Sequence, residues 1–215
     1  MRSWSKIYSK KIEELGGIEK YLNCKVKEKK LFLGKIGKYT NKRGKILEAG
    51  CGTGVLSIYL SNRGFSVTAV DVDKDMLNIA KKISEHYCER PTFQKIDLFS
   101  LEYPSDYFDL VFSHGVLEHF SDKQIITLLK KQLSISKTLI FSVPSNYLTK
   151  KDRYFGNERF LSLNKWKEII RQTPAEIIEI FGFHYILGWK KYWDTLTRGK
   201  IFGPLPYLTF VLRKK

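Results

Sequence analysis

Short apolar runs alternate with amphipathic segments through the middle of the chain. The runs are rich in β-branched residues and end at glycine, proline or acidic positions, which is typical of buried strands. The expected strands are Lys45–Ala49, Phe65–Asp71, Phe93–Asp97, Tyr107–Ser113 and Lys137–Val143. Between them, apolar residues recur at helical spacing, and this predicts helices at 54–63, 74–88 and 121–133. Ser121 or Asp122 is the expected cap of the last of these helices.

Strands that alternate with helices predict a parallel sheet covered by helices on both faces. After Pro144 the pattern changes to a polar loop at about 145–160, a helix at 163–172 and strands at 176–181 and 207–212. Residues 1–43 look helical, with a break at Gly16–Gly17. We therefore expect an N-terminal helical cap over residues 1–43, followed by a single α/β domain over residues 44–215.

The bulk composition narrows the class of protein. A length of 215 residues with 43% apolar residues suits one such domain. No run approaches the roughly 20 apolar residues that span a bilayer, and the first residues lack the apolar core of a secretory signal. The cysteines Cys24, Cys51 and Cys88 form neither a disulfide framework nor a metal-binding pattern. These features predict a cytoplasmic protein without a bound metal.

The formal net charge is +16, and it comes from the two ends of the chain. Residues 1–45 carry 14 Lys and Arg against 4 Asp and Glu, residues 184–215 carry 7 against 1, and the middle is neutral. Basic ends would suit an anionic partner such as nucleic acid, a phosphorylated metabolite or a membrane surface. Runs such as Lys25–Lys30 also suit the solvated face of a helix, and we favour this simpler interpretation.

Glycine, acidic and serine residues stand where the first strands end. They are Glu48 and Gly50 at the first strand, Asp71 at the second, Asp97 at the third and Ser113 at the fourth. Because ligands of open α/β sheets bind at the carboxyl ends of the strands, we expect these residues to converge on one site. The glycine turn also lets a ligand approach the backbone and directs the N–H groups of a helix N-terminus towards it.

Each acid has a chemical interpretation and a plainer one. Asp71, about 20 residues after the glycines, stands where a carboxylate accepts hydrogen bonds from ribose hydroxyls, but it could instead cap the helix at 74–88. Asp97 could accept from the exocyclic amine of adenine or simply end a strand. Glu48 could hold an ammonium group or brace the turn. Their joint register favours a nucleotide-like cofactor.

NAD is the main alternative cofactor. Its fingerprint is Gly-x-Gly-x-x-Gly, whereas the glycines here follow Gly-x-Gly-x-Gly, and Val55 stands where the third fingerprint glycine belongs. An acid two residues before Gly50 also suits a compact cationic ligand better than a pyrophosphate. S-adenosylmethionine lacks a pyrophosphate and carries an ammonium group, so it fits this turn better.

Four blocks between residues 45 and 145 stand in an order that resembles one family. The blocks are Glu48–Gly54, Val70–Leu77, Asp97–Leu98 and Tyr107–His119. The first matches the Glu-x-Gly-x-Gly-x-Gly signature of class I S-adenosylmethionine-dependent methyltransferases. The last is similar to the fourth-strand block of their small-molecule branch, which includes ubiquinone- and biotin-pathway enzymes.

This resemblance implies a fold, a cofactor and a set of binding residues. The implied fold is a Rossmann-like sheet of seven strands in the order 3-2-1-4-5-7-6, mostly parallel, with the last strand antiparallel. The implied cofactor is S-adenosylmethionine, with S-adenosylhomocysteine as its product. The residues implied to bind it are Glu48, Gly50, Cys51, Gly52, Gly54, Asp71, Val72, Met76, Asp97, Leu98 and Ser113.

The acceptor end of the site is less defined. His114 and His119 follow the fourth strand and are the candidate general bases, although His119 also suits a structural role at a helix start. Asn146, Tyr147 and Tyr154 could line an acceptor pocket or lie on a loop surface.

Two further segments are candidates for covering the site and for selecting its substrate. The family resemblance implies that Trp4, Tyr8 and Ile12 form a lid, and the charged and aromatic loop at 150–159 is a natural place for specificity. Ser113-His114-Gly115-Val116 replaces the Asn-Pro-Pro-Tyr type of segment, which argues against methylation of nucleic-acid bases or glutamine side chains.

Three functions compete on these grounds. The first is methyl transfer to oxygen, nitrogen or carbon of a small metabolite. The second is methylation of RNA, suggested by the basic ends. The third is a cofactor-binding or partner subunit without catalysis.

Overall fold

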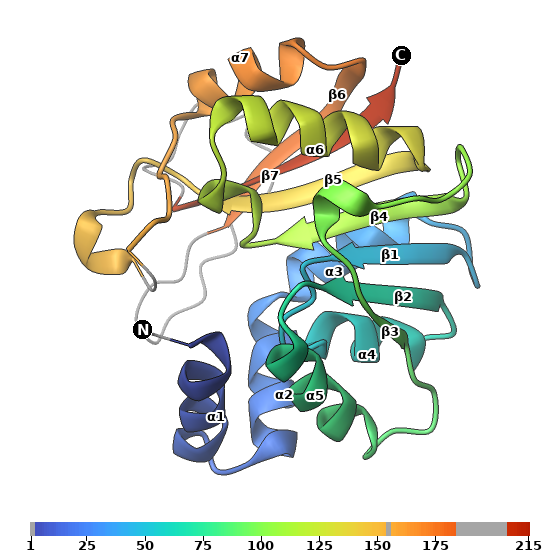
Figure 1. Ribbon diagram of the computed structural model, residues 1–215, viewed down its shortest axis with the longest axis vertical. Coiled ribbons are helices and arrows are strands. Elements are labelled where there is room, and N and C mark those ends of the chain that lie inside the picture. The colour runs from blue at the N-terminus through green and yellow to red at the C-terminus, as the bar shows by residue number, and fades with distance from the viewer. Residues whose placement is uncertain (1–2, 154–155, 184–205) are drawn as a thin grey trace.

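The computed structural model describes residues 3–153, 156–183 and 206–215, and its centre is a seven-stranded sheet (Figure 1). The strand order is β3-β2-β1-β4-β5-β7-β6, so the predicted order is confirmed. All pairings from β3 to β5 are parallel, whereas β7 runs antiparallel to both β5 and β6. The strands are β1 (Lys45–Ala49), β2 (Ser66–Asp71), β3 (Thr92–Lys95), β4 (Phe108–His114), β5 (Ser136–Pro144), β6 (Ala175–Phe183) and β7 (Tyr207–Lys214).

Helices cover both faces of this sheet, as the alternating pattern predicts. The α-helices are α1 (Trp4–Glu14), α2 (Ile18–Glu28), α3 (Lys30–Tyr39), α4 (Val55–Ser61), α5 (Lys74–Ser84), α6 (Asp122–Ser134) and α7 (Leu163–Arg171). Short 3₁₀ turns lie at η1 (Leu98–Ser100), η2 (Leu117–His119) and η3 (Lys150–Asp152). The predicted cap of α6 is confirmed, because Ser121 and Gln124 form a reciprocal capping box.

The alternation of side chains along the strands divides the core between the two faces. On β4, Leu110 and Phe112 pack with α3 and α4, whereas Val111 packs with α6 and α7. Trp166 of α7 is fully buried on the second face, and Figure 1 shows α6 and α7 together on that side of the sheet. The two covered faces leave the carboxyl ends of the parallel strands for a ligand site.

The N-terminal region forms three helices, because the chain breaks at Lys29 as well as at Gly16–Gly17. The break at Lys29 was not predicted. Helix α3 buries Phe32 and Ile36 against the sheet, whereas α1 has no buried residue. Where an N-terminal cap would end and the α/β domain begin therefore stays a prediction.

Two strand ends differ from the predicted ones in ways that matter for the site. Strand β3 ends at Lys95, so Asp97 lies beyond it and caps η1 by accepting a hydrogen bond from the backbone N of Phe99 at 2.9 Å. Strand β4 extends to His114, which pairs with Ser142 of β5. Among the described residues, no helix is both long and apolar enough to cross a membrane.

Candidate functional site

The glycine turn between β1 and α4 has a backbone that requires glycine. The φ angles are 77° at Gly50, 52° at Gly52 and 68° at Gly54, a region that side chains disfavour. A Cβ atom at Gly50 would also lie 2.6 Å from Cγ2 of Val116. The backbone N atoms of Gly50 and Cys51 both donate to the carbonyl oxygen of Val70 at 2.9 Å, so the turn is fixed to β2.

Asp71 ends β2 and holds the glycine turn from the other side. Its Oδ2 accepts from the backbone N of Gly52 at 2.8 Å, and its Oδ1 accepts from the backbone N of Asp73 at 3.0 Å. The cap of α5 is Asp73, whose Oδ1 accepts from the N atoms of Asp75 and Met76. Asp71 is therefore not the helix cap. Burial raises the pKa of its carboxyl group, and the backbone N–H donors oppose that rise.

Glu48 lies beneath the turn as a buried carboxyl group. Its Oε2 accepts hydrogen bonds from the backbone N of Ser57, at 3.1 Å, and from the Ser57 hydroxyl. Burial raises its pKa to about 8 although both bonds to Ser57 lower it. This geometry supports the bracing role, because Ser57 lies in the first turn of α4.

An apolar surface adjoins the glycine turn. The side chains of Met76 and Leu98 are buried and border a cavity, and Val72 borders the same cavity while 62% exposed. The exposed apolar side chain of Val72 and the buried apolar side chains beside it could together contact a flat apolar group of a ligand. Asp97 lies at the same edge and is exposed.

The cavity has a volume of about 910 Å³ and lies where the parallel strands end. Most of the predicted cofactor residues line it, together with both candidate histidines. These are Glu48, Gly50, Cys51, Gly52, Asp71, Val72, Met76, Asp97, Leu98, His114 and His119.

Two predicted cofactor residues do not border the cavity. Gly54 begins α4 against Ala80 and Phe93, so there is no room for a ligand beside it. Ser113 lies one residue before His114 on β4, so its side chain points to the opposite face of the sheet.

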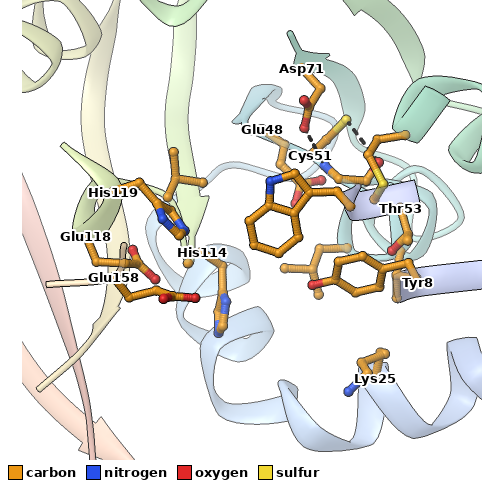
Figure 2. Close-up of a pocket in the computed structure, with 18 of the residues that line it drawn as sticks. Tyr8, Lys25, Glu48, Cys51, Thr53, Asp71, His114, Glu118, His119 and Glu158 are labelled. Carbon is orange, nitrogen blue, oxygen red and sulfur yellow. Dashed lines mark hydrogen bonds between the residues drawn. The ribbon is translucent and has the colours of Figure 1, made fainter. Parts of the chain in front are cut away.

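A second group of polar residues lies at the other end of the cavity (Figure 2). Lys29 is the N-cap residue of α3, and His114 ends β4. Glu118 lies in η2, and Glu158 lies in the loop before α7. Glu118 and Glu158 are only 4% and 6% exposed. Glu158 lies in the loop at 150–159 that the sequence indicated as a place for specificity, whereas Lys29 and Glu118 were not predicted as site residues, because charged residues within short polar segments carry little signal without the fold.

The electrostatics of this group are set by burial. Burial raises the pKa of Glu118 to about 8, with a further contribution from Glu158. Burial lowers the pKa of Lys29 to about 7, and Lys25 lowers it further. The pKa of His114 is well below its ordinary value for the same two reasons, burial and neighbouring lysines. His114 is therefore neutral at pH 7.

Arg159 brings the loop carrying Glu158 against η2. Its backbone N donates to the carbonyl oxygen of Glu118 at 2.9 Å. Its guanidinium donates from Nη1 to the carbonyl oxygen of Phe120 and from Nη2 to Oδ1 of Asp122, each at 2.6 Å. These bonds place the neighbouring residue Glu158 beside η2. Its Oε2 accepts a hydrogen bond from the backbone N of Gly156 at 2.8 Å.

The two histidines have different surroundings. The ring of His114 packs edge-on against Phe32 at 5.4 Å. Nδ1 of His119 is 2.8 Å from Oδ1 of Asn157, and its ring packs edge-on against Trp4 at 5.7 Å. His119 thus links η2 to the loop and to α1, which suits the structural role that the sequence left open.

Parts of the predicted lid and loop also border the cavity. Trp4 and Tyr8 of α1 line it, whereas Ile12 packs beside Tyr21 instead. The hydroxyl of Tyr21 lies 3.2 Å from Oγ1 of Thr53, so α2 is tied to the glycine turn.

Residues of the loop at 150–159, which the sequence indicated as a place for specificity, border the cavity. Leu148, Asp152 and Asn157 line the cavity, whereas Asn146 and Tyr147 do not, and Tyr147 is 59% exposed. Tyr154 lies outside the described residues.

Part of the sequence matches a known protein family. Residues 46–138 match the family model described as a methyltransferase domain. These residues are therefore similar to a methyltransferase domain. The matched part runs from β1 to the first residues of β5, so it includes the glycine turn, Asp71, His114 and Glu118. Glu158 and the helices α1 to α3 lie outside the matched part.

Two curated relatives are similar to this chain in sequence. A malonyl-[acyl-carrier protein] O-methyltransferase from Paenibacillus sp. (strain JDR-2) is 30% identical over 64% of this chain and 59% of its own length. A ubiquinone biosynthesis O-methyltransferase from Coxiella burnetii (strain Dugway 5J108-111) is 33% identical over 40% of this chain and 36% of its own. The chain thus spans about a third to three fifths of the length of these relatives.

A solved structure shows the same fold. Magnesium protoporphyrin IX methyltransferase from Synechocystis PCC 6803, crystallised with bound S-adenosylmethionine, has a TM-score of 0.63 to this chain. The likeness covers 89% of this chain and 78% of that one at 18% sequence identity. At this identity, the likeness concerns the fold.

Proposed function

We propose that this chain is an S-adenosylmethionine-dependent methyltransferase that acts on oxygen, nitrogen or carbon of a small-molecule acceptor. One observation carries the proposal: a glycine turn braced by Asp71, an apolar surface at Met76 and Leu98, and a separate polar end share one cavity. The two curated relatives, both O-methyltransferases by name, support the same reaction class.

The residues at the glycine end fit the proposed cofactor. A Cβ atom at Gly52 would lie 3.7 Å from Met76, so the open side of this glycine leaves space beside the backbone. Each oxygen of Asp71 accepts one backbone hydrogen bond and keeps a lone pair for a ribose hydroxyl. Val72, Met76 and Leu98 would contact the adenine, with Asp97 near its amine.

Glu48 and Gly50 would lie near the amino-acid end of the cofactor. Because its pKa is about 8, the Glu48 carboxyl group is protonated in the protein alone at pH 7. An ammonium group brought next to it would favour the charged form. Glu48 would then both brace α4 and receive the ammonium group.

When it is bound, the cofactor supplies an electrophilic methyl group. The chain's own contribution would be alignment and exclusion of water. Trp4 and Tyr8 border the cavity from α1, and Tyr21 and Thr53 fix α2 to the glycine turn. These helices would hold the cofactor and acceptor in line.

A general base is needed only for acceptors that must lose a proton as they react. His114 is the better candidate, because it lies in the polar end of the cavity and is neutral at pH 7. Normal turnover of a His114→Ala variant on the true acceptor would exclude this role. His119 is proposed as a residue that positions the loop through Asn157.

The test is release of S-adenosylhomocysteine in the presence of metabolite and RNA panels, combined with calorimetric titrations of S-adenosylmethionine and NAD. We expect S-adenosylmethionine to bind, NAD not to bind, and turnover to occur with a small acceptor. Binding of NAD alone would overturn the cofactor assignment. Turnover with RNA, with affinity falling steeply as salt rises, would favour the RNA alternative. Cofactor binding without turnover on any panel would favour the non-catalytic alternative.

A further inference from the structure

Glu118 and Glu158 form a buried carboxyl pair at the end of the cavity away from the glycine turn. Figure 2 shows the two side chains together beside His114, on the opposite side of the view from Asp71 and Cys51. Both residues border the cavity, and both are more than nine-tenths buried. Two carboxyl groups are not brought into a buried site for stability alone, because each loses its hydration there.

The two carboxyl groups differ in what satisfies them. Oε2 of Glu158 accepts from the backbone N of Gly156, and Oε2 of Glu48, at the other end, accepts from Ser57. Oε2 of Glu118, in contrast, is buried without a hydrogen-bond partner within the described residues. A buried polar atom left without a partner costs about 1–3 kcal/mol, so it calls for an explanation. Because Glu118 lies in the wall of a cavity, the simplest explanation is a ligand that forms the missing hydrogen bond with its Oε2.

The charges around Glu118 indicate which ligand that is. His114 is neutral at pH 7, and Lys29, whose pKa is about 7, is only partly charged; Lys25 is the neighbouring lysine that acts on both of them. Glu118 is itself protonated at pH 7, because its pKa is about 8, but Glu158 contributes to that raised pKa and so disfavours a further negative charge beside it. A carboxylate would therefore meet the charge of Glu158, whereas a group that donates a hydrogen bond would meet the unpartnered Oε2 of Glu118.

We propose that Glu118 is the specificity-determining residue of the acceptor end, and that it accepts a hydrogen bond from a hydroxyl or a protonated amine of the methyl acceptor. Glu158 lies beside it and strengthens the preference against carboxylates. The inference deepens the proposed function and rests on it, since the other end of the cavity would hold the cofactor. It places the acceptors among hydroxyl and amine compounds and excludes free carboxylates.

Lys29 is the group that could reverse this preference. Its Nζ lies 5.6 Å from the ring centroid of Tyr207, on the same cavity wall. If Lys29 dominated recognition, a carboxylate acceptor would bind best. The experiment is therefore built on ligands that differ only in the recognised group.

The test measures binding of three probes to the full chain loaded with S-adenosylhomocysteine, by ligand-observed NMR. The probes are phenethylamine, phenethyl alcohol and phenylpropionate, which present an ammonium, a hydroxyl and a carboxylate on similar scaffolds. We expect the amine and the alcohol to bind at least about tenfold more tightly than phenylpropionate. Tighter binding of phenylpropionate, or no binding of the amine and the alcohol, would overturn the proposal.

Variants of Glu118 make the test specific. Glu118→Ala should remove the preference for both donors. Glu118→Gln, which keeps the shape and one acceptor oxygen, should retain the alcohol but lose most of the preference for the amine, because Gln cannot take up the negative charge that a bound ammonium group would favour on Glu118. Glu102→Gln, an exposed position that does not border the cavity, is the matched control and should behave as the wild type.

Folding and the proposed function are checked separately. Thermal melting and calorimetry with S-adenosylhomocysteine establish that each variant folds and is loaded, and the Gln variant serves if the Ala variant does not fold. If the wild type fails to bind S-adenosylhomocysteine, the proposed function fails. The probe series on the unloaded chain would then still decide the role of Glu118, and a preference unchanged in the Glu118 variants would overturn it.

Discussion

Asp71 and Gly52 are joined by a hydrogen bond of 2.8 Å from the backbone N of Gly52 to Oδ2 of Asp71. The bond links the end of β2 to the glycine turn after β1, which are neighbouring strands of the sheet. The carboxylate therefore shapes the turn and also faces the cavity that the turn borders. A change at Asp71 should affect ligand binding through both routes.

Asp71→Ala should weaken S-adenosylmethionine binding by roughly 1.5–3 kcal/mol, because it removes the carboxylate that we propose to accept hydrogen bonds from two ribose hydroxyls. Calorimetry measures the affinity, and urea unfolding measures the stability. Asp73→Ala is the matched control, because it removes the cap of α5 without removing the bond to Gly52. It should cost about 1 kcal/mol of stability and leave affinity nearly unchanged. Equal affinities of the wild type and Asp71→Ala would exclude Asp71 from the binding site.

Gly50→Ala should be far more damaging than an alanine at another glycine with similar φ. The new Cβ would lie 2.6 Å from Cγ2 of Val116 while the backbone stays at a φ of 77°. Gly64 has a φ of 88°, but a Cβ atom there would meet nothing within 4 Å, so Gly64→Ala reports the backbone strain alone. We expect Gly64→Ala to cost about 1–2 kcal/mol and Gly50→Ala to cost more and to abolish cofactor binding.

Urea unfolding and calorimetry on both glycine variants check this prediction. Adding Val116→Ala to Gly50→Ala should recover part of the lost stability, because the clash is with the Val116 side chain. If Gly50→Ala and Gly64→Ala destabilise the chain equally, the contact with Val116 does not determine the residue at position 50.

The sequence could predict the sheet because its strands are short, apolar and bounded by glycine and acids. The direction of individual side chains on β4 could not be predicted in the same way. Ser113 and His114 are neighbours on this strand, so the alternation of side chains turns only one of them towards the cavity, and an apolar run that is buried on both faces does not show which one.

The acceptor end was harder to predict because it is assembled from distant segments. Glu118 and Glu158 are 40 positions apart in the sequence, and a bond from the backbone of Arg159 to Glu118 brings them together. No local pattern records such a contact. The glycine end was predictable because Glu48, Gly50 and Asp71 stand at consecutive strand ends, where local sequence and the site coincide.

Arg159→Met should loosen the loop that carries Glu158. The variant loses the bonds from the guanidinium to the carbonyl oxygen of Phe120 and to Asp122. Because the Arg159–Asp122 pair is about one-third exposed, global stability should change by only about 1 kcal/mol or less. Hydrogen exchange at residues 156–160 should nevertheless rise several-fold, since local opening becomes easier.

Lys165→Met is the matched control for Arg159. Lys165 also pairs with Asp122, at 3.1 Å, but makes no bond to Phe120. Its removal should leave exchange in the loop close to that of the wild type. If both variants loosen the loop equally, Asp122 rather than the bond to Phe120 is what holds it.

The stability of the chain should depend on pH through Glu118. Its pKa is raised to about 8 in the folded chain, against an unfolded value near 4.5. The folded state therefore holds a proton that the unfolded state has released over this interval. The resulting contribution is fully present below about pH 4.5 and is lost as pH rises towards 8, by up to about 1.4 kcal/mol per pH unit.

Glu118→Gln keeps the shape of the side chain and removes this titration. Relative to the wild type, the variant should become steadily more stable as pH rises from about 5 to 8, measured as the difference in free energy of unfolding in urea. Taking the difference cancels the contributions of Glu48 and His114, which both proteins share, and leaves that of Glu118 together with its interaction with Lys29. Glu102→Gln, on the surface, tests whether removal of any carboxylate produces the same change. If the difference in unfolding free energy between the wild type and Glu118→Gln stays constant across this range, Glu118 has the same pKa in the folded and the unfolded chain. Its buried carboxyl group would then already be charged when an acceptor binds.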